Sequence, residues 1–138
     1  MQDEKINENI PIAADAWNKA EAIEWLGGDE ELLRELVEVF IAESRKPVLT
    51  LRDAVFSSDA DGVVRGAHSI KGELGCLGAI AAANTAQKLQ TMGINNEMSG
   101  APEMFRKLER EMQAIKLTLV QWAANCQRDE HSQVVPTL

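Results

Sequence analysis

The sequence predicts an all-α protein, folded as an antiparallel up-down four-helix bundle with a short extra helix at the N-terminus. The composition is rich in the helix formers Ala, Leu and Glu, and its 138 residues include 4 Pro and 0 Tyr. Apolar residues recur at intervals of three and four over several long stretches, as they do in amphipathic helices. The connections between those stretches are short, which places consecutive helices side by side and antiparallel.

The length fits one domain with a real hydrophobic core, since hydrophobic residues make up 45% of the chain. We expect a flexible lead over residues 1–12, where Pro11 and several polar residues argue against regular structure. The bundle should occupy residues 13–126. Residues 127–138 should form a flexible tail.

The first two helices are separated by a glycine pair. A short helix should run from about Ala13 to Leu26, because the following Gly-Gly pair suits a helix end. Asp29 is a good N-cap for a helix over about 30–57. Pro47 must kink or break that helix. The apolar phase continues past Pro47, so we expect one long bent helix, with two separate helices as the alternative.

The remaining helices follow at short intervals. The third should run over about 60–77 and end at Gly78. The fourth follows almost directly, over about 79–92. Gly, Asn, Ser and Pro cluster over 93–102 and predict a loop, and the last helix should run over about 103–125.

Charge and composition exclude several classes of protein. The net charge of −8 disfavours binding to nucleic acid and to anionic membranes, which are polyanions. An apolar run long enough to span a membrane is missing, and the polar N-terminus does not resemble a signal peptide. The 2 Cys residues have no spacing typical of a zinc site or a disulfide framework. We therefore expect a cytoplasmic protein without membrane insertion.

The stretch over residues 67–79 stands out because it contains one of the 2 His residues on an unusual helix face. On a helix, Gly72 and Gly75 lie within about 40° of His68, and Lys71 lies beside them one turn away. The apolar stripe is on the opposite side and consists of Val63, Ile70, Leu74 and Leu77. His68 should therefore lie near mid-bundle, on the outer side of its helix.

Each glycine inside a helix costs roughly 1 kcal/mol relative to alanine. Two glycines on the face of His68 let a bulky partner approach the imidazole closely. Lys71 then offers a cation to an anion held on the ring. The pattern alone leaves an alternative open, in which His68 is an ordinary solvated or hydrogen-bonded surface residue and the glycines serve helix packing.

The stretch resembles the signature of histidine-containing phosphotransfer (HPt) domains, A-H-x-[LI]-K-G-x-x-x-x-[LI]-G. Every fixed position is met, by Ala67, His68, Ile70, Lys71, Gly72, Leu77 and Gly78. The similarity extends upstream over residues 23–33 to Phe40 and downstream through Leu89, and it covers about residues 15–125. It implies a phosphocarrier of bacterial two-component phosphorelays. It thus favours the chemical reading of His68 over the surface reading.

The resemblance implies that His68 accepts a phosphoryl group from the aspartyl phosphate of a response-regulator receiver domain and passes it to another receiver. Nε2 of the ring would be the nucleophile, since neutral imidazole is nucleophilic. Lys71 would offset charge on the phosphoryl oxygens. Gly72 and Gly75 would give the receiver access to the ring, and Val64 and Arg65 could add to the docking surface.

The resemblance also implies the partners, which are receiver domains and, in some pathways, a hybrid sensor histidine kinase. It places magnesium in the receiver, so we expect no metal and no cofactor here, and a monomer. Two positions depart from the common pattern. Glu73 stands where a small residue is usual, and Gln90 where an acidic residue often follows the leucine. We expect these changes to affect the choice of partner and to leave the site intact.

Rival functions lack necessary parts. A metal site would need ligands at i+3 or i+4 from His68, where Lys71 and Gly72 stand. The sequence has no phosphate-binding loop or ATP motif, so we expect a phosphotransfer intermediate and not a kinase. Two alternatives stay open: a bundle that binds receivers without accepting phosphate, and the phosphorylated N-terminal domain of a chemotaxis-type histidine kinase.

Overall fold

The described part of the chain consists of six α-helices and one short 3-10 helix, with no strand among them. The computed structural model describes the backbone of residues 17–134 and the side chains of residues 17–126. The lead predicted over residues 1–12 lies outside the described residues. The all-α class predicted from composition and periodicity is confirmed.

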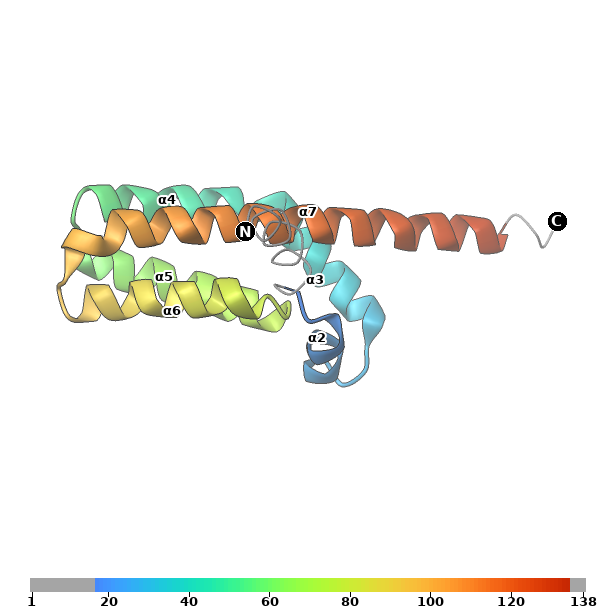
Figure 1. The fold of residues 1–138 in the computed structure, drawn as a ribbon. Helices are drawn as coiled ribbons and strands as arrows, with labels where there is room; N and C mark the ends of the chain where they lie inside the picture. Colours follow the sequence, from blue (N-terminus) through green and yellow to red (C-terminus); the bar gives the residue numbers. More distant parts are fainter. Residues whose placement is uncertain (1–16, 135–138) are drawn as a thin grey trace, which may run out of the picture.

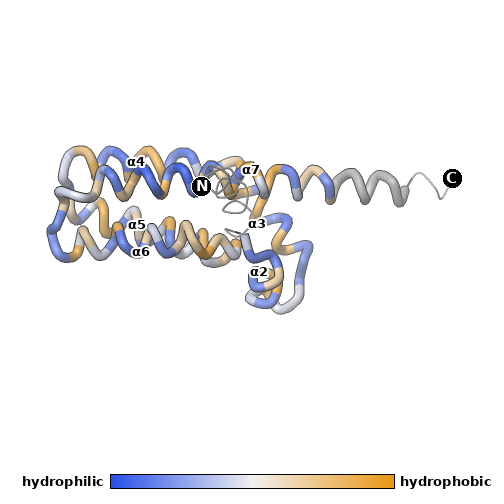
Figure 2. The backbone as a smooth tube through the Cα atoms, in the orientation of Figure 1, coloured by the Kyte–Doolittle hydropathy of each residue, from blue (hydrophilic) through white to orange (hydrophobic). Residues whose placement is uncertain are grey.

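Four helices form the body of the molecule and alternate in direction along the chain (Figure 1). One layer holds α4 and α7, and the other holds α5 and α6, which pack closely against each other. Apolar and polar residues alternate along each of these helices (Figure 2), and the apolar ones form the core. The bounds are α4 (Arg45–Phe56), α5 (Ala60–Cys76), α6 (Ile80–Ile94), η1 (Met98–Gly100) and α7 (Ala101–Val134).

The long bent helix predicted over residues 30–57 is wrong, because the structure has two helices there. α3 (Glu30–Glu43) ends at Ser44, and α4 begins at Arg45. Pro47 lies in the first turn of α4 and has no N–H to donate to the carbonyl of Glu43. The chain therefore changes direction at Ser44, upstream of the proline, and α3 leaves the axis of α4 to cross toward α2 (Figure 1).

The short N-terminal helix is α2 (Lys19–Trp25), which begins later than predicted because Asn18 caps it through a hydrogen bond to the N–H of Glu21. It is tied to the turn between α5 and α6. The N–H of Asn18 donates to the carbonyl of Gly78 over 2.9 Å, and Trp17 Nε1 donates to the carbonyl of Leu77 over 2.7 Å. This turn also needs the left-handed backbone of Gly78, at φ 80°.

The last helix is longer than the sequence pattern indicates. We predicted an end near residue 125 and a tail over residues 127–138, but α7 continues to Val134. Its apolar spacing stops after Ala123, which is why the periodicity predicts an earlier end. Residues 124–134 include no glycine or proline, so the sequence offers no helix breaker there.

Candidate functional site

α5 presents His68 to solvent, where its place off the apolar stripe predicted it. The side chain is exposed, and the stripe opposite it (Val63, Ala67, Ile70 and Leu74) is buried. Asp59 caps the start of the helix, and its carboxylate accepts a hydrogen bond from the N–H of Gly62. A fixed N-terminus and a buried stripe hold the rotation of α5, so the direction of His68 is set by the fold.

Gly72 and Gly75 leave open space on the face of His68. A Cβ atom built on either glycine would meet no atom within 4 Å. Gly93 on α6 is different, because a Cβ there would lie 2.8 Å from Val64 Cγ2 and 3.0 Å from the carbonyl oxygen of Ala60. Packing therefore explains Gly93 but not Gly72 or Gly75. Since packing does not require glycine at these two positions, the open surface beside His68 is consistent with the approach of a partner protein.

α6 supplies polar partners to this face of α5. Lys71 Nζ donates to Gln87 Oε1 over 2.7 Å, and Gln87 Nε2 donates to Thr91 Oγ1 over 3.3 Å. The two helices approach closely because the buried face of α6 carries the small residues Ala82, Ala86 and Gly93. The ammonium of Lys71 is thus held on the α6 side of His68, one helical turn along α5.

Gln90 on α6 is a polar side chain that reaches the ring of His68. Its Nε2 lies 3.4 Å from His68 Nδ1, while its Oε1 is buried without a hydrogen-bond partner. Rotating the terminal amide by half a turn would place the oxygen against Nδ1, where it could accept the ring proton. The expectation that Gln90 leaves the site untouched is therefore wrong. The sequence feature that could have predicted this contact is the spacing of Gln87, Gln90 and Thr91, which places all three on one face of α6.

The two further docking residues do not share one surface. Val64 is half-buried, with Cγ2 directed at Gly93 on α6. Arg65 is exposed and lines a groove of about 1100 Å³ between α4 and α5, together with Ser69. Val64 thus flanks the α6 side of His68, and Arg65 flanks the α4 side.

Glu73 follows the site on α5 and faces α3. Burial raises the pKa of the Glu73 carboxyl above its ordinary value, and the charge of Glu43 raises it further. Folding therefore favours the protonated form of the Glu73 carboxyl more than full exposure to water would.

No group of three or more His, Cys, Asp and Glu side chains in the described part of the chain could hold a metal ion. No helix within it is both long enough and apolar enough to cross a membrane.

Known proteins share the fold and part of the sequence of this chain. The fold is similar to the crystal structure of histidine-containing phosphotransfer protein B (HptB) from Pseudomonas aeruginosa PAO1, with a TM-score of 0.73 and 22% sequence identity, covering 80% of this chain and 96% of that one. The curated proteins include no significant match. The sequence matches the Hpt domain family over residues 35–118, which include His68, Lys71 and both open glycines. The chain therefore belongs to the Hpt domain family, the histidine phosphotransfer modules of two-component signalling.

Proposed function

We propose that His68 is a phosphocarrier, which accepts a phosphoryl group from the aspartyl phosphate of a receiver domain and relays it to another receiver. One observation carries the proposal. An exposed histidine lies beside two helix glycines, Gly72 and Gly75, that the packing does not require. A helix that gives up roughly 1 kcal/mol at each glycine must gain something else there, and access to the ring is what the glycines provide.

The transfer step balances within the two proteins. Nε2 of His68 attacks the phosphorus, an N–P bond forms, and the P–O bond to the receiver aspartate breaks, so the carboxylate leaves. The ring gains positive charge as the bond forms. Gln90 Oε1, turned toward Nδ1, would hold the Nδ1 proton and leave the Nε2 lone pair free for attack. Gln90 thus acts as a positioning residue.

Lys71 stabilises the charge that the phosphoryl oxygens carry. Its ammonium now donates to Gln87 Oε1, at an exposed position on the α6 side of His68. A flexible lysine can exchange this neutral acceptor for an anionic phosphoryl oxygen, because the charge-assisted hydrogen bond is the stronger one. Magnesium belongs to the receiver in this scheme, and the bundle contributes no metal and no ATP site. We also propose a cytoplasmic monomer.

The relay is tested with two receiver domains, one labelled with ³²P on its aspartate and one unlabelled. The wild-type chain should carry label from the first receiver to the second, and His68→Gln should block the transfer while keeping the helical far-UV circular dichroism. His68 is exposed, so this substitution leaves the core untouched. Receiver binding without any transfer would indicate a docking bundle and would refute the phosphocarrier.

A further inference from the structure

The layer of α4 and α7 carries a groove on the side away from His68. Two hollows of about 350 and 520 Å³ share Leu49, Arg52 and Glu109 and so form one continuous depression. We call it the α4–α7 groove. Its lining includes Arg45, Leu49, Arg52 and Phe56 from α4, and Arg106, Glu109, Gln113 and Lys116 from α7.

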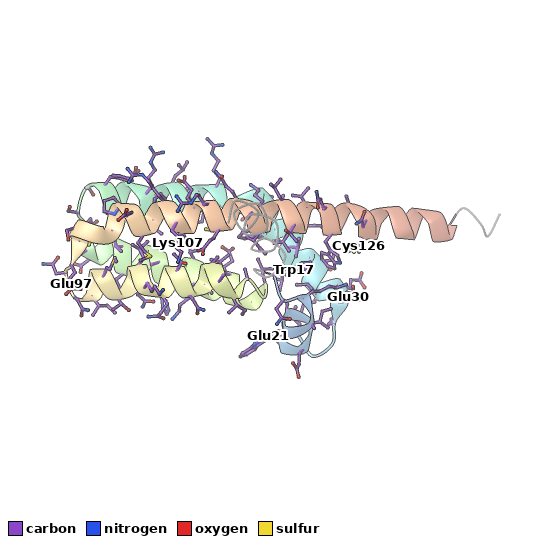
Figure 3. All side chains as sticks on the ribbon, in the orientation of Figure 1. Trp17, Glu21, Glu30, Glu97, Lys107 and Cys126 are labelled. Atoms are coloured by element: carbon purple, nitrogen blue, oxygen red, sulfur yellow. The ribbon has the colours of Figure 1, made fainter. Side chains whose placement is uncertain are left out.

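The α4–α7 groove is basic in an acidic protein. Its lining holds four cationic residues (Arg45, Arg52, Arg106 and Lys116) and two carboxylates (Asp53 and Glu109), whereas the chain carries −8 overall. Among the described residues, none of these four cations forms an ion pair. Nitrogen-tipped side chains project from the outer side of α4 (Figure 3). Unpaired cations around a hollow suit an anionic partner.

Phe56 lies at one end of the groove, where α4 ends, between two of its cations. It is 49% exposed and packs edge-to-face on the buried Phe105, with ring centroids 6.3 Å apart. The guanidinium groups of Arg106 and Arg52 lie 5.3 and 6.0 Å from its ring centroid. A guanidinium held against a ring keeps its N–H edges free for carboxylates. Arg and aromatic residues in this arrangement are typical of binding hot spots.

The shape of the groove points to a helix as its occupant. It lies between two antiparallel helices, and the residues at its edge on α4 recur at Arg45, Leu49, Arg52 and Phe56, the spacing that packs against another helix. Leu49 is 40% exposed and offers a second apolar contact. The two carboxylates in the groove repel a continuous polyanion such as nucleic acid. A partner whose acidic residues are spaced apart can pair with the cations and avoid these carboxylates.

We propose that the α4–α7 groove binds an acidic amphipathic helix of a partner protein. Its apolar side chains would cover Leu49 and Phe56, and its carboxylates would pair with Arg45, Arg52 and Arg106. Because α5 and α6 form the opposite layer, His68 stays accessible while the groove is filled. The bundle could then be held at a partner while phosphotransfer continues on the other face.

The test uses a fluorescent synthetic helix with leucines at heptad positions a and d and glutamates beside them, titrated with the full chain and followed by fluorescence anisotropy. We expect saturable binding in the micromolar range, and about tenfold weaker binding by the double variant Arg52→Glu/Arg106→Glu. Phe56→Ala keeps the charge and should also weaken binding. The matched control is Lys107→Glu/Arg110→Glu, which makes the same charge change on exposed positions of α7 outside the groove (Lys107 is labelled in Figure 3).

Several outcomes would overturn the proposal. These are the absence of saturable binding, equal weakening by the control pair, and equal binding of a peptide with lysines in place of the glutamates. Binding of a single-stranded oligonucleotide or a phosphatidylglycerol vesicle with the same dependence on Arg52 and Arg106 would show an unselective anion surface. A dimer in sedimentation that the double variant abolishes would assign the groove to a second copy. Phosphate acceptance on His68 is measured separately in the variant Arg52→Glu/Arg106→Glu. Loss of peptide binding with normal phosphate acceptance concerns the groove alone, and loss of phosphate acceptance in the wild type concerns the phosphocarrier alone.

Discussion

Replacing Gly72 and Gly75 together with alanine should make the protein more stable and a poorer phosphocarrier. Neither glycine has a positive φ, and a Cβ at either position would meet nothing within 4 Å. Each substitution therefore gains the helix propensity of alanine, about 0.5 to 1 kcal/mol, without strain. The pair should raise the free energy of unfolding by about 1 to 2 kcal/mol.

Urea denaturation followed by circular dichroism measures this gain. With a slope of about 2 kcal/mol per molar urea, the midpoint should rise by about 0.5 to 1 M. Gly93→Ala is the matched control, because its Cβ would lie 2.8 Å from Val64 Cγ2 and 3.0 Å from the backbone of Ala60. It should lose about 1 to 3 kcal/mol through overpacking.

The functional half of this prediction needs a receiver. The alanine pair should slow transfer from a phosphorylated receiver, and Gly75→Leu should weaken receiver binding further while the fold survives. Failure of the alanine pair to stabilise would show that α5 needs these glycines for its own structure. A stabilised pair, together with a Gly75→Leu variant that binds and transfers like wild type, would refute the access argument.

Three other predictions concern side chains around the ring. Lys71→Ala should slow phosphate acceptance by about tenfold without abolishing it, since one charge-assisted hydrogen bond is lost; rapid-quench kinetics measures the rate, and an unchanged rate would remove the proposed role. Gln90→Ala should reduce the share of the Nδ1–H tautomer of His68 in ¹⁵N NMR spectra and slow transfer; an unchanged tautomer ratio would contradict the positioning role. Glu73 has a raised pKa in the folded state, so its contribution to stability falls as pH rises through the window above its ordinary value. Glu73→Gln should therefore be more stable than wild type at neutral pH and lose that advantage in acid, and equal stability at every pH in urea titrations would contradict it.

The site shows how far one helix can be predicted from its own sequence. The direction of His68 follows from its spacing to Val63, Ile70 and Leu74, because those residues must be buried. The contacts from α6 do not follow from it. Gln87 reaches Lys71, and Gln90 reaches His68, because small residues on α6 let the two helices approach closely. The distance and register between α5 and α6 depend on both helices, so the sequence of α5 alone does not predict these contacts.

Some helix ends could likewise be predicted from the sequence, and others could not. Asp59 and Gly78 mark the ends of α5 through local effects, a side-chain cap and a left-handed backbone, and the end at Gly78 was predicted from the sequence. The break between α3 and α4 was placed at Pro47, but the missing hydrogen bond acts on the preceding turn and the chain bends at Ser44. The end of α7 was placed where the apolar stripe stops. Apolar periodicity predicts which residues are buried, and a helix can continue past the last residue of its apolar stripe.

The most direct test of the phosphocarrier is the chemistry of the phosphate on the chain itself. The wild-type protein and His68→Gln are each incubated with a ³²P-labelled receiver, separated from it, and exposed to acid and to base. We predict label on the wild type alone, lost in acid and retained in base, as a phosphoramidate on a histidine requires. Label on His68→Gln, or base-labile label on the wild type, would place the phosphoryl group on another residue and contradict the central claim.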